Sequence, residues 1–545
     1  MNETGQKKQN IFAKSGVRWG LGYLFILLCG VGLVYYWRVI YGFSYFTPAF
    51  ATFLVCAFFS AMYLVVFLCA HFVRQNLPVK AALLIFFAGL CFAAANPPLQ
   101  APDETMHFVR SYALGSGDFS FDQNKDYPAD VDALVEAFPG FYNSQLIQTE
   151  KASMMRGYER YYDILSGREQ PAPNATTLTQ QFLYYLPQAA GVAAGRLLGA
   201  DALVCMYLAR VVNLAVYAAL CGMAVYCASR FVPLLIALMA SPVALFISAS
   251  CSPDALFLGA SWLFIGVCLS AWVSPRRLAA LAGSFVLMYC TKPTAAALLP
   301  LLLLLDFRGS CLPLPRSKGW GEKKRLAVQI ALTAAGCLAL GWLCSQLLGA
   351  YTAFASNYGR VDYAIPGIDG AAQLRFILQN PVRYAAVFLY TLYRDKANLF
   401  SGGAFGWMDM VLPFVNYFTP MVWLFAAGLC AREAAREKTW KLWVIGLCGA
   451  LMYAATYTGM YLTSTPVSLP EINGVQTRYL MAGFFALFVT AAALLGRTMA
   501  LQDTQRVRPQ KTPPAWRMLH ISYCFAVVSA ILLFQNYYIG ETLAA

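Results

Sequence analysis

Residues 80–110, KAALLIFFAGLCFAAANPPLQAPDETMHFVR, decide how this chain folds. The first half, 80–95, is an apolar run long enough to cross a bilayer. The second half opens on two prolines and places two acids, a histidine and an arginine within residues 103–110. The stretch therefore predicts a membrane helix that leaves the lipid into a polar segment suited to chemistry.

The spacing of the charged residues in that segment would place them on one face of a helix. If Pro102 opens a helix, Asp103 and Glu104 stand four and three residues before His107, and Arg110 follows one turn later. Acid, imidazole and cation would then lie together as a candidate catalytic group. The alternative is that the two acids only complement the positive end of the helix dipole.

The composition places the whole chain in the membrane. Of 545 residues, 59% are hydrophobic and 12% are charged, which is outside the range of soluble globular proteins. The sequence predicts an all-α polytopic membrane protein with about thirteen spans. The predicted spans are 19–40, 49–72, 80–95, 202–228, 231–249, 255–273, 326–349, 411–430, 440–462, 479–497 and 518–538, with a short hairpin of 278–291 and 294–306.

Residues 181–198 are apolar but break the alternation of the loops. A full span there would move Arg276 and Arg277 to the outer side, so we expect the segment to be re-entrant or interfacial. This topology leaves the N-terminus in the cytoplasm and the C-terminus outside. The first apolar run ends in Tyr35-Tyr36-Trp37-Arg38 without a small-residue cleavage site, which favours an anchor over a signal peptide.

The net charge of +14 raises nucleic acid as a partner, but the basic residues gather in short loops on one side of the predicted membrane. This distribution indicates a cytoplasmic rim and no nucleic acid. The 16 cysteines lie almost entirely in apolar runs and are expected to pack there. The sequence contains no CxxC pair and no glycine-rich phosphate loop.

The polar segments divide the chain into five parts. In 96–180, acids outnumber bases twelve to six, the reverse of the cytoplasmic loops, so this part is predicted to be a large outer loop of short helices. The parts are 1–95, N-terminal membrane helices; 96–180, the outer loop; 181–349, central membrane helices; 350–410, an outer interfacial segment; and 411–545, C-terminal membrane helices.

Further polar residues fall at predicted outer helix ends. Asp254 enters an apolar helix, where an acid is costly without a partner or a cavity. Lys292 is either a snorkelling interfacial lysine or a phosphate ligand. Arg478 suits bidentate phosphate binding, with ordinary interfacial placement as the alternative. The remaining candidate binding residues are Arg110, Trp407, Asp409, Gln476 and Tyr479.

Three motifs carry a family resemblance. They are Pro102-Asp103-Glu104 with His107, then Phe405-Gly406-Trp407-Met408-Asp409 followed by Pro413, and Val475-Gln476-Thr477-Arg478-Tyr479. With these motifs the chain resembles the bacterial membrane-protein family DUF2142, a group of the GT-C-like integral membrane glycosyltransferases. Thr477 stands where that family usually has a glycine.

The resemblance implies a GT-C-like fold in the bacterial plasma membrane with an extracytoplasmic active site. It implies transfer of a hexosyl or pentosyl group, with inversion, from a polyprenyl-phosphate donor to a cell-envelope glycan or lipid-linked acceptor. Asp103 would be the base, and Glu104 an alternative base or, with Asp103, a ligand of a divalent metal. His107 would orient the acids, and Arg478 and Lys292 would hold the phosphate.

Two other classes of function stay open. A flippase or transporter of lipid-linked glycans also needs apolar grooves and cations in the membrane, but transporters usually show repeated halves and mid-membrane sites. Because the polar groups here gather at one predicted face, the sequence favours an enzyme. The third class is a scaffold subunit whose acids only cap helices.

Overall fold

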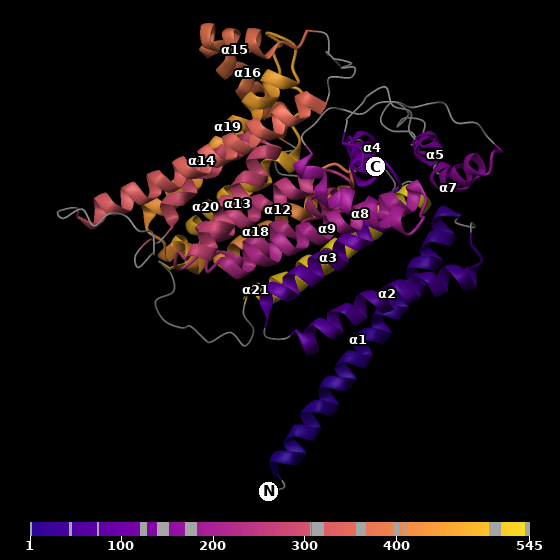
Figure 1. Ribbon diagram of the computed structural model, residues 1–545. Helices are drawn as coiled ribbons and strands as arrows, with labels where there is room; N and C mark the ends of the chain where they lie inside the picture. The colour runs from indigo at the N-terminus through magenta and orange to yellow at the C-terminus, as the bar shows by residue number, and fades with distance from the viewer. Residues whose placement is uncertain are drawn as a thin grey trace. The chain divides into compact units, whose positions relative to one another are not determined.

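The computed structural model describes residues 3–42, 46–73, 76–119, 128–138, 152–168, 182–305, 307, 321–355, 367–396, 403–407, 410–500 and 514–539 (Figure 1). Within these ranges the chain is all-α, as predicted, apart from an isolated antiparallel bridge between Phe405 and Met410. Nine of the described helices are long and apolar enough to cross a membrane. They are α1 (Glu3–Tyr41), α2 (Pro48–Phe72), α3 (Leu77–Ala95), α9 (Ala202–Cys227), α14 (Glu322–Ala355), α18 (Pro413–Arg436), α19 (Thr439–Thr463), α20 (Thr477–Ala500) and α21 (Pro514–Phe534).

Four of the predicted spans are shorter than a full crossing and are not among these nine. Segment 231–249 forms two helices, α10 (Val232–Met239) and α11 (Pro242–Ser248). The other three form α12 (Asp254–Cys268), α13 (Pro275–Thr291) and the 3-10 helix η3 (Pro293–Leu304). The reason is proline, which lacks a backbone N–H and disfavours helical backbone in the residue before it. A proline begins each of these helices or lies next to its first residue.

Segment 181–198 does not form a membrane-length helix. The described part contains the 3-10 turn η2 (Leu183–Tyr185) and α8 (Leu186–Leu197). Twelve residues of helix extend about 18 Å, well short of the ~30 Å hydrocarbon core. This agrees with the prediction that the segment does not cross. Instead, α8 packs on α9 and on the short helix α4 (Glu104–Gly115).

The chain divides into two compact units. The first comprises Met1–Asn76 with Phe534–Ala545, and the second comprises Leu77–Leu533. In the first unit α1 pairs with α2, and Trp37 donates its indole N–H to Gln535 Oε1 over 2.9 Å. Gln535 opens η4, a π-helix of Gln535–Ile539. All candidate site residues belong to the second unit.

The core of the second unit is built on α9, which packs against α3, α8 and α12 (Figure 1). The contact between α9 and α12 is close at Gly266, where an added Cβ would lie 2.6 Å from the carbonyl oxygen of Ala224. Only glycine permits this backbone approach. The helices α10, α11 and α12 are buried almost completely, as expected for helices that are apolar on every side.

Short helices lie between the long ones along the chain. The loop 96–180 contributes α4, α5 (Ala129–Ala137) and α7 (Ala152–Leu165). The segment 350–410 contributes α15 (Gly370–Gln379) and α16 (Pro381–Arg394). These two are separated at Asn380, whose φ of −131° leaves the helical region because Pro381 follows it.

Candidate functional site

The backbone leading into α4 is strained at two residues. Leu99 and Asp103 have φ of 61° and 59°, the left-handed region that side chains other than glycine rarely adopt. The helix begins at Glu104, so the prediction that Pro102 opens it is wrong, but Asp103 still interacts electrostatically with His107 of α4. Asp103 instead stands at the N-cap, exposed, and its side chain accepts no hydrogen bond from the backbone N–H groups of the helix. Strain of this kind concentrates at functional sites.

Glu104 is buried and fully paired. Arg210 of α9 donates from Nε to Glu104 Oε1 over 2.8 Å and from Nη2 to Oε2 over 2.6 Å, and both side chains are 0% exposed. The backbone N–H groups of Ala101 and Cys251 donate to the same carboxylate. Its lone pairs are therefore used, which makes Glu104 a structural anchor in this arrangement and a poor candidate for a base or a metal ligand.

Arg210 was not among the predicted site residues. Besides Glu104, it donates to the carbonyl oxygens of Ala93, Asn96 and Pro97, which closes the end of α3. The signal was present in the sequence, because a lone arginine inside the apolar run 202–228 is costly and calls for a partner. What the sequence did not reveal is that the partner is Glu104.

A second charged cluster joins three separate helices. Asp254 is the first residue of α12. Its Oδ1 lies 2.7 Å from Lys292 Nζ, and its Oδ2 accepts a hydrogen bond from Arg478 Nε over 2.6 Å. Lys292 links α13 to η3, and Arg478 is the second residue of α20. Tyr479 completes the cluster, with Lys292 Nζ 3.5 Å from its ring centre and its hydroxyl 3.1 Å from Arg478 Nη2.

The two charged clusters are connected through one turn. Cys251, which donates its N–H to Glu104, precedes Asp254 by three residues. The turn is further fixed by Asn213, whose Nδ2 donates to the carbonyl oxygens of Ser250 and Ser252. The buried Glu104–Arg210 pair is thus linked by a hydrogen bond to the turn that leads to Asp254.

His107 lies beside this second cluster. Its Nδ1 is 2.7 Å from the hydroxyl of Tyr185 in η2, and its ring interacts electrostatically with Asp103, Asp254, Arg478 and Lys292. Burial lowers the pKa of the His107 imidazole to about 4, so the ring is neutral at pH 7. Burial also raises the pKa of the Tyr185 hydroxyl well above its usual range, which keeps that group protonated.

The other predicted residues lie around these groups. Trp407 donates its indole N–H over 3.2 Å to the carbonyl oxygen of Leu99, next to the strained entry of α4. Gln476 lines a small cavity together with Arg478, and its side-chain oxygen is buried there without a hydrogen bond. Arg110 is buried on α4 and interacts electrostatically with Tyr185. Asp409 lies outside the described residues.

The predicted site residues from α4, α12, the α13–η3 junction and α20 therefore meet in one region. Asp103 interacts electrostatically with Arg478 although 375 positions separate them in the chain. Among the described residues, no three His, Cys, Asp or Glu side chains are grouped closely enough to hold a metal ion.

The long apolar helices and the charged cluster at their ends define an all-helical, multi-pass membrane protein. More particularly, the chain belongs to a family described as a predicted membrane protein, DUF2142, whose profile matches residues 86–487. The matched region includes both charged clusters. No curated protein and no solved structure matches the chain.

Proposed function

We propose that this protein is a membrane glycosyltransferase that moves a sugar from a polyprenyl-phosphate donor to an acceptor of the cell envelope. The observation that carries the proposal is the bridge of Asp254 between Lys292 and Arg478, beside the exposed carboxylate of Asp103. Two cations held by a carboxylate in a nearly dry setting form a ready site for a phosphate, which presents the same kind of anionic oxygens.

In the proposed reaction the Asp103 carboxylate takes the proton of the acceptor hydroxyl. The acceptor oxygen forms a bond to the anomeric carbon, and the bond from that carbon to the phosphate oxygen breaks. The polyprenyl phosphate leaves with the electron pair of that bond, and Lys292 and Arg478 stabilise its charge. This single displacement inverts the anomeric centre.

The remaining residues position these groups in the proposal. The neutral imidazole of His107, held by Tyr185, would accept or donate a hydrogen bond at the sugar beside Asp103. Glu104 would act only as a positioning residue, because Arg210 holds its carboxylate and the Cys251 N–H of the turn before Asp254 donates to it. Trp407 would hold the strained backbone at Leu99 that presents Asp103.

The proposal also includes the membrane orientation. We place the N-terminus in the cytoplasm of a bacterial cell, the charged site at the outer face of the plasma membrane, and about thirteen crossings in a GT-C-like arrangement. The shorter helices α10 to α13 and η3 would complete the four crossings beyond the nine long helices, enclosed by protein where their backbone is interrupted.

The experiment uses purified protein in proteoliposomes with synthetic polyprenyl-phosphate hexoses and pentoses and cell-envelope extract as acceptor. Released polyprenyl phosphate is the readout for wild type, Asp103→Asn and the control Asp163→Asn, which removes an exposed acid of α7 that pairs with Arg168. We expect at least 100-fold slower release from Asp103→Asn and unchanged release from the control. Equal release from all three proteins would eliminate Asp103 as the base.

One observation favours a second candidate, a flippase or transporter of lipid-linked glycans. Interrupted helices such as α10 and α11 are typical of transporters, where half-helix ends bind the substrate. In sealed vesicles this alternative predicts movement of a labelled polyprenyl-phosphate sugar to the opposite leaflet with the sugar still attached. Sugar transfer without such movement would exclude it.

A further inference from the structure

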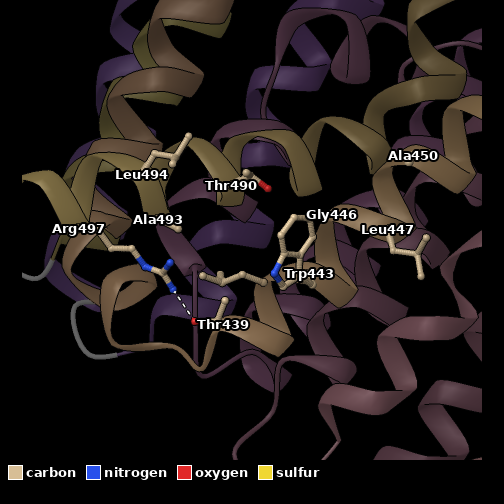
Figure 2. Close-up of a pocket in the computed structure, with 10 residues that line it drawn as sticks. Thr439, Trp443, Gly446, Leu447, Ala450, Thr490, Ala493, Leu494 and Arg497 are labelled. Carbon is tan, nitrogen blue, oxygen red and sulfur yellow. Dashed lines mark hydrogen bonds between the residues drawn. The ribbon is translucent and has the colours of Figure 1, made fainter.

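A groove runs between α19 and α20 near the ends that join the basic segments 432–441 and 497–517. Its volume is about 530 Å³. Figure 2 shows the indole of Trp443 along it, with Arg497 at one end. The lining includes Thr439, Trp443, Gly446, Thr490, Leu494 and Arg497.

The groove is apolar along its length and open to the surroundings of the helices. Trp443 and Leu494 are 75% and 65% exposed. Gly446 leaves the groove unfilled, because an added Cβ there would meet only Thr490 Oγ1 at 3.9 Å. From Thr439 to Ala450 the helix rises about 16 Å, which is close to the ~15 Å depth of one bilayer leaflet.

One end of the groove is polar and positive. Arg497 donates from Nη2 to Thr439 Oγ1 over 3.1 Å, and the guanidinium forms no ion pair with any described residue. The sequence of residues 432–441 contains four basic and two acidic residues. An excess of bases in a short loop between membrane helices marks the cytoplasmic side. The exposed Trp440 and Trp443 fit the level of the headgroups, where indoles concentrate.

We propose that this groove binds an anionic phospholipid of the cytoplasmic leaflet, with one acyl chain along α19 and the phosphate on Arg497. The apolar length matches one chain, and Arg497 with the surrounding bases matches a negative headgroup. A lipid is favoured over a second copy of the protein because the groove is positive at its mouth, and two such mouths facing each other would repel. The site does not depend on the function proposed above.

The test is native mass spectrometry of the full chain with added phosphatidylglycerol or phosphatidylcholine. We expect one retained phosphatidylglycerol per chain and at least tenfold weaker retention of phosphatidylcholine. Arg497→Gln should reduce phosphatidylglycerol retention at least tenfold, whereas Arg375→Gln, at an exposed arginine of α15, should not. Gly446→Leu should fill the groove and abolish retention, whereas Gly428→Leu, at an open glycine of α18, should not.

A photoactivatable phosphatidylglycerol provides a second measurement on wild-type protein, independent of whether Gly446→Leu folds. Cross-links to peptides of α19 and α20 would support the site. Three results would overturn it: equal retention of both lipids, equal retention by each variant and its control, or phosphatidylglycerol cross-links that fall outside α19 and α20.

Discussion

Glu104 and Arg210 form a buried ion pair that ties the start of α4 to the middle of α9, with 2.6 Å between Glu104 Oε2 and Arg210 Nη2. Arg210 also caps the carbonyl groups at the end of α3. One pair therefore connects a membrane-length helix, the strained entry of α4 and, through Cys251, the turn before Asp254.

Removing one partner of this pair should strongly destabilise the protein. Glu104→Gln leaves the Arg210 guanidinium buried and uncompensated, which we expect to cost about 3–5 kcal/mol. The measurement is thermal unfolding in detergent. The control is Arg168→Gln, which breaks an exposed pair with Asp163 and should cost about 1 kcal/mol or less. Similar losses in the two variants would contradict a special role for the buried pair.

Replacing Asp254 should make the protein respond to phosphate. Asp254→Asn leaves Lys292 and Arg478 facing each other without a counter-charge, so we expect a loss of about 2–4 kcal/mol. Inorganic phosphate should recover part of this stability in the variant and have little effect on wild type, where Asp254 occupies the cations. In the control Asp369→Asn, at the N-cap of α15, unfolding should stay independent of phosphate. An absence of phosphate stabilisation in Asp254→Asn would argue against a phosphate site.

The strained backbone at Asp103 should lower the stability of the protein while presenting the carboxylate that the proposed function needs. Asp103→Gly relieves the φ of 59° and should stabilise the protein by up to about 1 kcal/mol, because glycine adopts this region freely. The same change should abolish the proposed sugar transfer. Asp163→Gly, in the helical backbone of α7, should instead destabilise by about 1 kcal/mol. A destabilised Asp103→Gly would show that the strain is offset by contacts of the side chain.

The low pKa of His107 predicts a loss of stability in mild acid. In the unfolded chain His107 takes up a proton near its ordinary pKa of about 6.5, whereas in the folded protein it does so only near pH 4. Between these values the unfolded state binds more protons, so stability should fall as pH falls from about 6.5 to 4. His107→Gln should flatten this dependence in thermal unfolding measured from pH 4 to 7, and His71→Gln should leave it unchanged. The same slope in both variants would exclude His107 as its source.

The membrane class and most of the long helices follow from the sequence by itself. Runs such as 202–228 and 479–497 are apolar for the length of a bilayer, and a backbone that must satisfy its own hydrogen bonds in lipid has no alternative to a helix. The interruptions were harder to predict, because an apolar run such as 231–249 keeps its composition while Pro242 divides it. Hydropathy reports how apolar the side chains of a segment are. It does not register that proline lacks the backbone N–H that a helix needs.

The candidate site shows what the sequence alone could not predict. The sequence singled out Asp254, Lys292 and Arg478 as costly polar residues at helix ends, but their direct contact depends on how α12, α13 and α20 pack. It also presented Asp103 and Glu104 as equivalent neighbours. Only the tertiary structure separates them, because the positive φ at Asp103 turns one carboxylate outward while Arg210, from another helix, holds the next one inside. Asp103 and Glu104 are adjacent in sequence but lie in opposite environments, one exposed and one buried, because Glu104 has a partner more than a hundred positions away.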